Sequence, residues 1–483
     1  MSFLGARNSI SLGIQGMLYA DTGTGTPVIA TDPYWSSVSM LLHGDGGNAA
    51  QNNTFLDGST NNFTVTRFGN TTQGSFNPFV STYPYSAATN GGSAYLDGTG
   101  DYLSLPSNAA FQFPINGSFT IECWVRLTTT GVYQYAYSAG TATGATDLYF
   151  GVYNTNVMAF VVSSGLGVGS YLALGTTALV ANTWYHIAVT RSTSTVRFFL
   201  NGAAETIAST SGTSSVAMPS AAGPAYVGTY FGTASFLNGY VSNLRVVNGT
   251  AVYTSAFTPS TTPLTAITNT ALLLGMSNGA IYDNAELNNL ETVANAQIST
   301  SVFKYGTGAL KFNGTTDYLS TPAKTAFVLG SGDFTIECWG YWNGTGNCVL
   351  VGQANSTGTT NPFYIDKGFG GTFISAIYAT GHTAYFCTSV ALIPTATWFH
   401  IAFVRDTNTL RQYINGVQDG TANVTGLSVE TSTGSVSLGA LGDFPSYYLN
   451  GYIDDFRFTK GICRYPSGTT FTPPTAAFPN KGP

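Results

Sequence analysis

Side chains able to ligate a metal ion recur at matching turn positions in the two halves of the sequence. Asp97 and Asp101 flank a Gly-Thr-Gly turn, and Asn313 and Asp317 flank the corresponding turn in the second half. Oxygen ligands held in turns are what Ca²⁺ requires, so these positions are candidates for a calcium site. The same side chains also cap tight turns by bonding to nearby backbone groups, which leaves a purely structural alternative open. The full set of candidates is Asp57, Asp97, Asp101, Asp283 and Asp317.

Carboxylates spaced for glycoside hydrolysis are missing from the sequence. A retaining glycosidase needs two carboxyl groups about 5 Å apart, and alternate residues of a strand would place them on one face. None of the glutamates has an acidic residue two positions away. Asp454 and Asp455 are adjacent, so a regular strand would point them to opposite faces. We predict that Glu122 and Glu337 are solvent-facing or paired strand residues.

The histidines offer no other catalytic arrangement. His186 and His400 occupy the same place in two WxHIA strands, where a histidine usually serves the core or an interface. Neither has a neighbouring Ser, Cys or Asp to complete a nucleophilic set, and no HExxH motif supplies a metal site. His43 and His382 are isolated. We therefore predict that the protein is not an enzyme and that calcium is the one cofactor to consider.

Aromatic side chains could receive a sugar, because apolar sugar faces stack on rings while the hydroxyl groups need directed polar partners. Tyr133, Tyr135 and Tyr137 alternate in the first half, and Tyr447 and Tyr448 replace Ser-Phe in the second. With 29 tyrosines in the chain, packing is the alternative role. A cell-surface glycan is an expected partner, without an assigned pocket.

The elements that must position these residues occur twice. Residues 119–124 and 334–339 both read FTIECW, and the motifs around them recur in the same order. The offset drifts by only a few residues, which indicates collinear domains that differ in loop length. The opening strands also correspond, since VSMLLHGDG at 38–46 parallels TALLLGMSNG at 270–279. We predict an N-terminal anchoring segment at 1–33, domains at 34–262 and 263–478, and a tail at 479–483.

Each copy is predicted to be a β-sandwich. Residues 119–125 alternate Phe, Ile, Cys and Val with Thr, Glu and Trp, which is the period of a strand with one buried face. Asn-Gly and Asp-Gly pairs between such runs mark hairpin turns. No amphipathic stretch of helical period extends convincingly over two turns.

Composition excludes several classes of protein. Charged residues make up 8% of the chain, hydrophobic residues 43%, and the net charge is −6. A chain this rich in apolar residues is expected to fold rather than stay disordered. It has no run of basic residues, so we expect no surface for nucleic acid. No apolar stretch approaches the roughly 18–20 residues of a membrane span, so no membrane insertion is expected. The start does not resemble a secretory signal, and five scattered cysteines predict neither a disulfide framework nor a zinc site.

The repeated motifs GTxDYLS, FTIECW, W(Y/F)HIAxxR and LNGYxxxxR together resemble the laminin G-like domains of the concanavalin A-like lectin/glucanase superfamily. The resemblance covers about residues 36–478. It implies an all-β fold of two tandem concanavalin A-like jelly-roll β-sandwiches, preceded by a short extended N-terminal segment. It does not select a function, because this fold hosts lectins, glycosidases, adhesion modules and virion proteins.

Low charge, tandem Gly/Thr/Ser-rich copies and a short unique start most resemble the structural proteins of tailed bacteriophages, in particular cyanophages. This resemblance implies localisation in the virion and a non-enzymatic role as a fibre, a capsid decoration or a neck or tail appendage for host attachment. Residues 1–33 would bind other virion proteins, and we expect a homo-oligomer, although no coiled-coil heptad is present. Two alternatives are a secreted or cell-surface carbohydrate-binding adhesin and a degenerate glycoside hydrolase.

Overall fold

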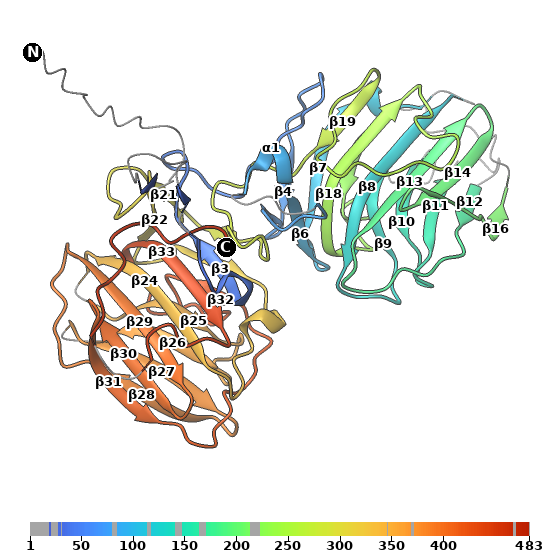
Figure 1. The fold of residues 1–483 in the computed structure, drawn as a ribbon. Coiled ribbons are helices and arrows are strands. Elements are labelled where there is room, and N and C mark those ends of the chain that lie inside the picture. Colours follow the sequence, from blue (N-terminus) through green and yellow to red (C-terminus); the bar gives the residue numbers. More distant parts are fainter. Residues whose placement is uncertain are drawn as a thin grey trace, which may run out of the picture.

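The computed structural model describes most of the chain (Figure 1). Of the predicted anchoring segment, it describes only residues 31–33 and two short strands, β1 (Tyr19–Ala20) and β2 (Val28–Ile29), which pair with each other. The expected extended course of the first thirty residues therefore lies largely outside the described residues. The described ranges are 19–20, 28–29, 31–79, 85–113, 117–140, 147–163, 171–212, 223–344, 346–368, 371–466 and 470–482.

Strands β4 to β19 form sandwich 1, which consists of two antiparallel sheets. In the first sheet the order is β16 (Ser209–Ser211), β12 (Tyr171–Leu174), β11 (Met158–Ser163), β10 (Asp147–Val152), β9 (Gln134–Ala139), β17 (Gly223–Val227), β7 (Tyr102–Asn108) and β4 (Thr66–Phe68). In the second it is β15 (Ala203–Glu205), β14 (Thr195–Leu200), β13 (Tyr185–Ser192), β8 (Phe119–Leu127), β18 (Asn238–Asn248), β6 (Ser93–Asp97) and β5 (Thr72–Gly74), with β19 (Thr270–Leu274) also beside β18.

Strands β20 to β33, joined by β3 (Val38–Leu42), form sandwich 2. One sheet has the order β20 (Glu291–Val293), β23 (Tyr318–Thr321), β32 (Val436–Leu438), β25 (Cys348–Gln353), β26 (Phe363–Lys367), β27 (Phe373–Ala379) and β28 (Thr383–Thr388). The other has β21 (Gln297–Ser299), β22 (Ala309–Asn313), β33 (Asn450–Lys460), β24 (Phe334–Trp342), β29 (Trp398–Asp406), β30 (Thr409–Ile414) and β31 (Val417–Asn423), with β3 also beside β33.

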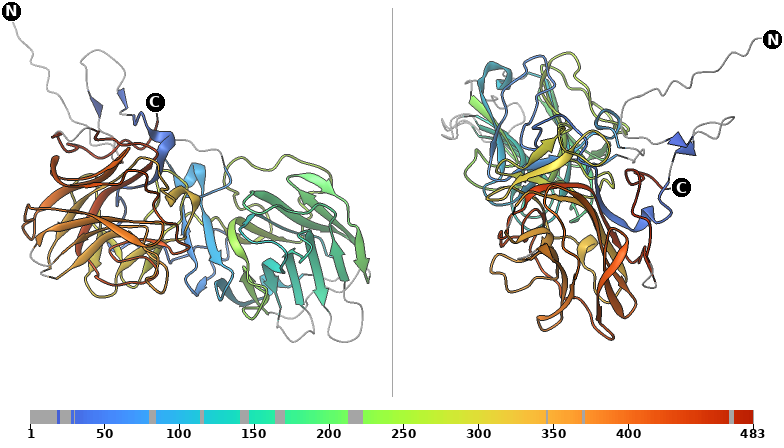
Figure 2. Two further views of the ribbon diagram at one scale, coloured as in Figure 1. Left: turned by 90° about the horizontal axis from the view of Figure 1, so that it is seen from below. Right: turned by 90° about the vertical axis from the view of Figure 1, so that its left-hand side faces the viewer.

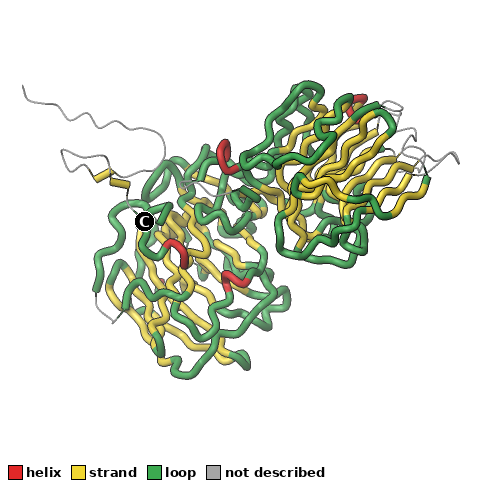
Figure 3. The backbone as a smooth tube through the Cα atoms, turned by 45° about the vertical axis from the view of Figure 1, so that its right-hand side comes forward, coloured by secondary structure: helices red, strands yellow, loops and turns green. Residues whose placement is uncertain are grey.

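Helical structure in the described residues is confined to single turns, and strands and loops make up both bodies (Figure 3). These turns are η1 (Trp35–Ser37), α1 (Ala87–Asn90), η2 (Ala109–Phe111) and η3 (Thr325–Phe327). The predicted all-β class of two tandem sandwiches is confirmed.

Each core lies between its two sheets, as the alternation of the FTIECW strands predicts. Ile121, Cys123 and Val125 of β8 belong to the apolar core of sandwich 1, and Ile336 and Cys338 of β24 to that of sandwich 2. Burial raises the pKa of the Cys123 and Cys338 thiols. The intervening residues of β8 and β24 therefore face outward, away from the core.

The opening strands are exchanged between the two sandwiches. β3 pairs antiparallel with β33, Leu41 opposite Arg457, while β19 pairs with β18, Leu273 opposite the equivalent Arg245. In Figure 1 the blue β3 accordingly lies against the orange-red body. The predicted boundaries at 34 and 263 assigned each opening strand to its own repeat, and the structure corrects this. The apolar pattern of such a strand requires burial but does not specify which of two similar acceptor strands it joins.

The two chain segments that cross between the sandwiches lie side by side. The Asn52 amide accepts hydrogen bonds from the backbone N–H groups of Ala280 and Ile281, both at 2.8 Å, and donates to the carbonyls of Ile281 and Leu290. Asn52 is fully buried, so these bonds satisfy an amide that would otherwise be costly to bury. Two crossings and two exchanged strands thus join the sandwiches (Figure 2).

Candidate functional site

Two of the calcium candidates, Asp57 and Asp283, hold the exchanged strands. The Asp57 carboxylate accepts hydrogen bonds from the backbone N–H of Leu273 in β19 at 3.0 Å and of Ser59 at 2.9 Å. The Asp283 carboxylate accepts from the backbone N–H of Leu41 in β3 at 2.9 Å. Each aspartate therefore binds the same position of the strand supplied by the other repeat.

The remaining oxygens of these two carboxylates also meet donors rather than an open site. Asp57 accepts from the Ser59 hydroxyl and the Phe63 N–H, and Asp283 accepts from the Asn288 amide at 2.7 Å. Burial raises the pKa of Asp283, although the hydrogen bonds oppose that shift. These bonds match the structural alternative for the two positions.

The other three candidates also accept hydrogen bonds from backbone N–H groups. Asp97 accepts from the N–H of Thr99 at 2.6 Å, and Asp101 accepts from the N–H groups of Asn70 and Asp97. Asp317 accepts from the N–H of Asn295 at 3.0 Å. Burial and the neighbouring Asp97 charge raise the pKa of Asp101 to about 7. In the described residues no three His, Cys, Asp or Glu side chains gather to hold a metal ion, so calcium stays a prediction without a located site.

Glu122 is at the centre of a buried polar cluster on the outer side of β8. It is fully buried and accepts from Arg245 through Nε at 2.9 Å and Nη2 at 2.6 Å. Its second oxygen lies 3.1 Å from His186 Nε2 and accepts from the Tyr253 hydroxyl. Burial would raise the pKa of Glu122, but the hydrogen bond from His186 and the charge of Arg245 lower it. Of the two predicted roles, the paired one is confirmed and the solvent-facing one is wrong.

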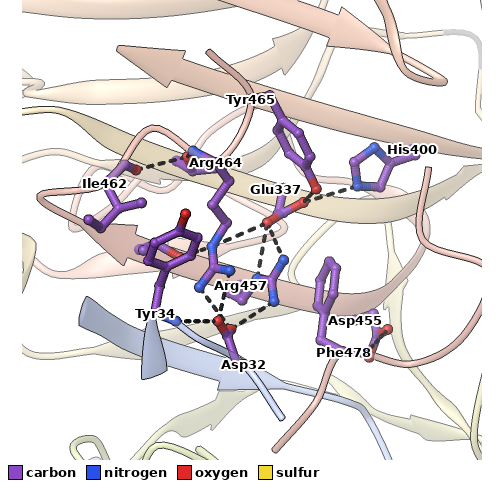
Figure 4. Close-up of polar contacts among 12 residues, drawn as sticks. Asp32, Tyr34, Glu337, His400, Asp455, Arg457, Ile462, Arg464, Tyr465 and Phe478 are labelled. Atoms are coloured by element: carbon purple, nitrogen blue, oxygen red, sulfur yellow. Dashed lines mark hydrogen bonds and ion pairs between the residues drawn. The ribbon is translucent and has the colours of Figure 1, made fainter. Parts of the chain in front are cut away.

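Sandwich 2 repeats this cluster around Glu337 (Figure 4). Arg457 donates to Glu337 Oε1 through Nε at 3.0 Å and Nη2 at 2.7 Å. The Tyr465 hydroxyl donates to Oε2, and His400 Nε2 lies 3.3 Å from it. A carboxylate fully occupied by cations and a phenol has no free lone pair positioned for proton transfer, and His400 is fully buried.

Asp32 extends the sandwich 2 cluster, and no carboxylate of the described residues plays its part beside Arg245 in sandwich 1. Its carboxylate accepts from Arg457 Nη1 at 3.0 Å and from Arg464 Nη2 at 2.8 Å (Figure 4). Its backbone N–H donates to the carbonyl of Lys481 near the other end of the chain. Sequence reasoning placed Asp32 in the anchoring segment, and no local motif signals a partner so far along the chain.

Asp454 and Asp455 are both buried because β33 contains a bulge at this point. Asp455 has φ +49°, a left-handed conformation that breaks the regular alternation of the strand. Its Oδ1 lies 2.5 Å from Nδ1 of His43, which β3 brings from the first repeat. The expectation of opposite faces holds only for a regular strand, and sandwich 1 carries Asn243 at the equivalent bulge.

The tyrosine candidates for sugar stacking do not converge on one surface. Tyr137 is fully buried, Tyr135 is buried against Tyr149, and Tyr133 is 39% exposed. Tyr447 is exposed in sandwich 2. Packing in the interior therefore accounts for Tyr135 and Tyr137.

A cleft lies between the sandwiches, at a place for which the sequence predicted no site. It has a volume of about 590 Å³ and is lined from sandwich 1 by Phe76, Arg126 and Tyr240, and from sandwich 2 by Pro322 and Lys324. It forms only because the loop before η3 covers the outer face of the β8 sheet. No local sequence signal reveals a site made by two domains.

The duplicated sandwiches correspond to a known family. A family model described as the concanavalin A-like lectin/glucanases superfamily matches residues 97–254 and 313–462, more than half of the chain. The chain belongs to this superfamily. Each of the two lectin/glucanase-type regions lies within one sandwich and leaves out its first strands. No curated protein matches the sequence.

Solved structures similar to this superfamily member include domains LG4-5 of the mouse laminin alpha1 chain, at 14% identity and a TM-score of 0.31, covering 84% of this chain and 98% of that one. The binding domain of Paraclostridial Mosquitocidal Protein 1 is 15% identical, with a TM-score of 0.31, covering 38% of this chain and 47% of that one. Domain 4 of the Geobacillus stearothermophilus arabinanase AbnA, in complex with arabinotriose, is 18% identical, with a TM-score of 0.30, covering 37% and 86%. In the described residues no helix is long and apolar enough to cross a membrane.

Proposed function

We propose that this protein is a non-enzymatic attachment protein of a tailed-phage virion. Residues 1–33 bind other virion proteins, and the two sandwiches are displayed as one body that contacts a cell-surface glycan. The absence of a free carboxylate pair or nucleophile in the described clusters supports a binding role over the degenerate glycosidase. Glu122 and Glu337 are committed to buried ion pairs with Arg245 and Arg457, and a buried histidine lies beside each carboxylate.

The observation that carries this proposal is the way the chain enters sandwich 2. Asp32 is bound by two arginines, and β3 begins six residues later and pairs with β33. A force applied through the preceding residues would act on a paired strand and a buried ion cluster rather than on a loose linker. Such an attachment suits a segment that anchors the protein to a particle.

The test is a deletion of residues 1–30, which leaves Asp32 and β3 in place. The truncated protein should unfold at the same temperature as the full chain but should fail to enter assembled particles. Incorporation at the level of the full chain would contradict the anchoring role. Light scattering on the full chain tests the expected homo-oligomer in the same preparations.

A secreted or cell-surface carbohydrate-binding adhesin is the second candidate, favoured by the cleft between the sandwiches. An adhesin would keep all of its glycan binding after the same deletion and would need no particle. Glycan arrays with and without EDTA then test the sugar and the calcium hypotheses together. Arrays without any signal would contradict the adhesin and the glycan contact of the virion protein.

A further inference from the structure

The cleft between the sandwiches places two cations over the same pair of aromatic rings. The Arg126 guanidinium carbon lies 5.2 Å from the centre of the Phe76 ring and 5.8 Å from that of Tyr240. The Lys324 ammonium lies 4.6 Å and 5.2 Å from the same two centres. Arg126 belongs to β8 of sandwich 1 and Lys324 precedes η3 of sandwich 2. The cleft therefore concentrates positive charge from both domains.

No carboxylate of the described residues forms a salt bridge with either cation. Lys324 Nζ donates to the carbonyl of Leu287 at 2.6 Å, which supplies partial charge only. Burial lowers the pKa of Lys324 to about 7, with Asp283 opposing that shift and the Arg126 charge adding to it. Burial also lowers the pKa of Arg126. Two adjacent cations without a counter-ion favour an anionic ligand.

The rest of the lining suits a ligand larger than a simple anion. The Thr128 hydroxyl donates to Asn238 and can still accept a hydrogen bond, and Asn182 offers an amide. The Tyr95 ring packs 5.0 Å from Tyr240. A volume of about 590 Å³ is in the range of small-molecule sites, which combine apolar walls with a few directed polar groups.

The charge of an adjoining cleft determines at which end of the site a negative group of the ligand can lie. That cleft shares Tyr95 and Pro322 with the first and is lined by Asp97, Glu291 and Asp443. Its acidic side chains would repel an anion, so a negative group is favoured at the Arg126 and Lys324 end alone.

We propose that the cleft binds an acidic saccharide, with its carboxylate or sulfate group between Arg126 and Lys324 and its hydroxyl groups against Thr128 and Asn182. This names the ligand class of the glycan contact proposed above and rests on that function. The aromatic pair supplies the apolar floor that a free inorganic anion would not use.

Sandwich 2 provides an internal control for this surface. Its equivalent cross-strand row runs from Lys311 through Tyr452 to Tyr341, as Tyr95, Tyr240 and Arg126 do in sandwich 1. Lys311 is exposed and lies outside the cleft. A lysine on the same kind of sheet face, without the second domain over it, should not bind the ligand.

The experiment uses the full chain and calorimetric titration with three oligosaccharides of equal length: one carrying uronic acids, one sulfated and one neutral. At least one acidic ligand should bind and the neutral one should not. Arg126→Gln and Lys324→Gln should each weaken binding by about tenfold, while Lys311→Gln should leave it unchanged. Unfolding temperatures equal to that of the parent would show that the variants are folded.

The possible outcomes distinguish a failure of the cleft proposal from a failure of the proposed glycan contact. Acidic binding that survives both cleft substitutions, or falls equally with Lys311→Gln, would overturn the cleft and leave the glycan contact intact. Equal binding of the neutral oligosaccharide would overturn the charge argument. Binding of no oligosaccharide would overturn both, while anchoring to particles remains testable by the deletion.

Binding should also depend on pH through Lys324. An anion beside the ammonium raises its pKa, so affinity should be high below pH 7 and should fall as the pH rises above the free value. Arg126 stays charged, and burial raises the pKa of Tyr95 to about 12 and also that of Tyr240, so neither phenol titrates in this range. Asp283 is the remaining charged group that acts on Lys324. The Lys324→Gln variant should lose this pH dependence, and a slope that persists would contradict the assignment.

Discussion

The two sandwiches share a fold but differ in the residues that receive the exchanged strand. In sandwich 2, His43 of β3 meets Asp455 at the bulge. In sandwich 1 the equivalent residues are Gly275 of the second opening segment and Asn243, whose amide oxygen accepts from the N–H of Leu264. The His43–Asp455 pair is therefore present only in sandwich 2, although both sandwiches receive their opening strand from the other repeat.

This difference favours the exchanged arrangement over an unexchanged one. If each opening strand stayed with its own repeat, His43 would face Asn243, and Asp455 would face Gly275. Buried Asp455 would then have no cation beside it, and leaving a buried charge unpaired costs several kcal/mol. The side chain at each bulge thus determines which opening strand binds there, whereas the apolar pattern of the two opening strands is too similar to do so.

Asp57 and Asp283, which hold the exchanged strands and are called the aspartate clamp below, make the same contact in both sandwiches. Asp57 and Asp283 bind backbone N–H groups, which every strand offers, so the clamp accepts either opening strand. General affinity comes from the clamp and the apolar residues, and specificity comes from His43 and Asp455.

The largest expected effect is an all-or-none crosslink that tests the exchange itself. Val38 lies opposite Thr459, so the pair Val38→Cys and Thr459→Cys should form a disulfide under mild oxidation. The matched pair Val38→Cys and Val247→Cys, adjacent only without exchange, should not. A mobility shift on non-reducing gels measures both. A crosslink in the second pair alone would refute the exchanged topology.

The next effect compares the two buried clusters. Glu122→Gln leaves Arg245 with no carboxylate and should lower the free energy of unfolding by about 3–5 kcal/mol, as expected for a broken buried pair. Glu337→Gln should cost about half as much, because Asp32 still pairs with Arg457. Urea unfolding measures both.

The control for this comparison removes the second carboxylate. In an Asp32→Asn background, Glu337→Gln should cost as much as Glu122→Gln does in the parent. Equal costs for the two single variants would contradict the assigned role of Asp32.

A smaller effect concerns pH. Burial and the Asp455 charge raise the pKa of Asp454 to about 8, and Asp455 raises the pKa of His43 against the effect of burial. Both groups bind protons more tightly in the folded state, so stability should fall as the pH rises from 5 towards 8. Asp455→Asn introduces the residue found in sandwich 1. It should reduce the loss of unfolding free energy between pH 5 and pH 8 by about 2 kcal/mol. Thermal unfolding between pH 5 and 8 measures it, and an unchanged slope would contradict the pairing.

The smallest effect tests the symmetry of the clamp. Asp57→Asn and Asp283→Asn should each lower the free energy of unfolding by about 1 kcal/mol, the net value of a hydrogen bond. Chemical denaturation of the two variants should give similar losses, and added Ca²⁺ or EDTA should change neither. A loss in only one variant would show that the clamps are not equivalent.

Much of the fold was predictable from local pattern. The alternation in FTIECW correctly placed Ile121 and Cys123 in the core and Glu122 on the outer side of the same strand. The duplicated motifs likewise predicted two sandwiches, because strand periodicity and turn residues act over short distances. The site was less predictable. The sequence identified Asp57 and Asp283 as possible metal ligands, but their carboxylates accept hydrogen bonds from strands that are distant in the sequence.

The amino-acid sequence alone determined that the chain would form two similar β-sandwiches. Only the tertiary structure decided which acceptor each opening strand joins, that Asp32 completes a cluster around Arg457, and that Arg126 and Lys324 meet across the domains. The physical reason is that strand pattern specifies which residues are buried, whereas the choice between two similar sheets depends on a few side-chain pairs brought together from distant parts of the chain.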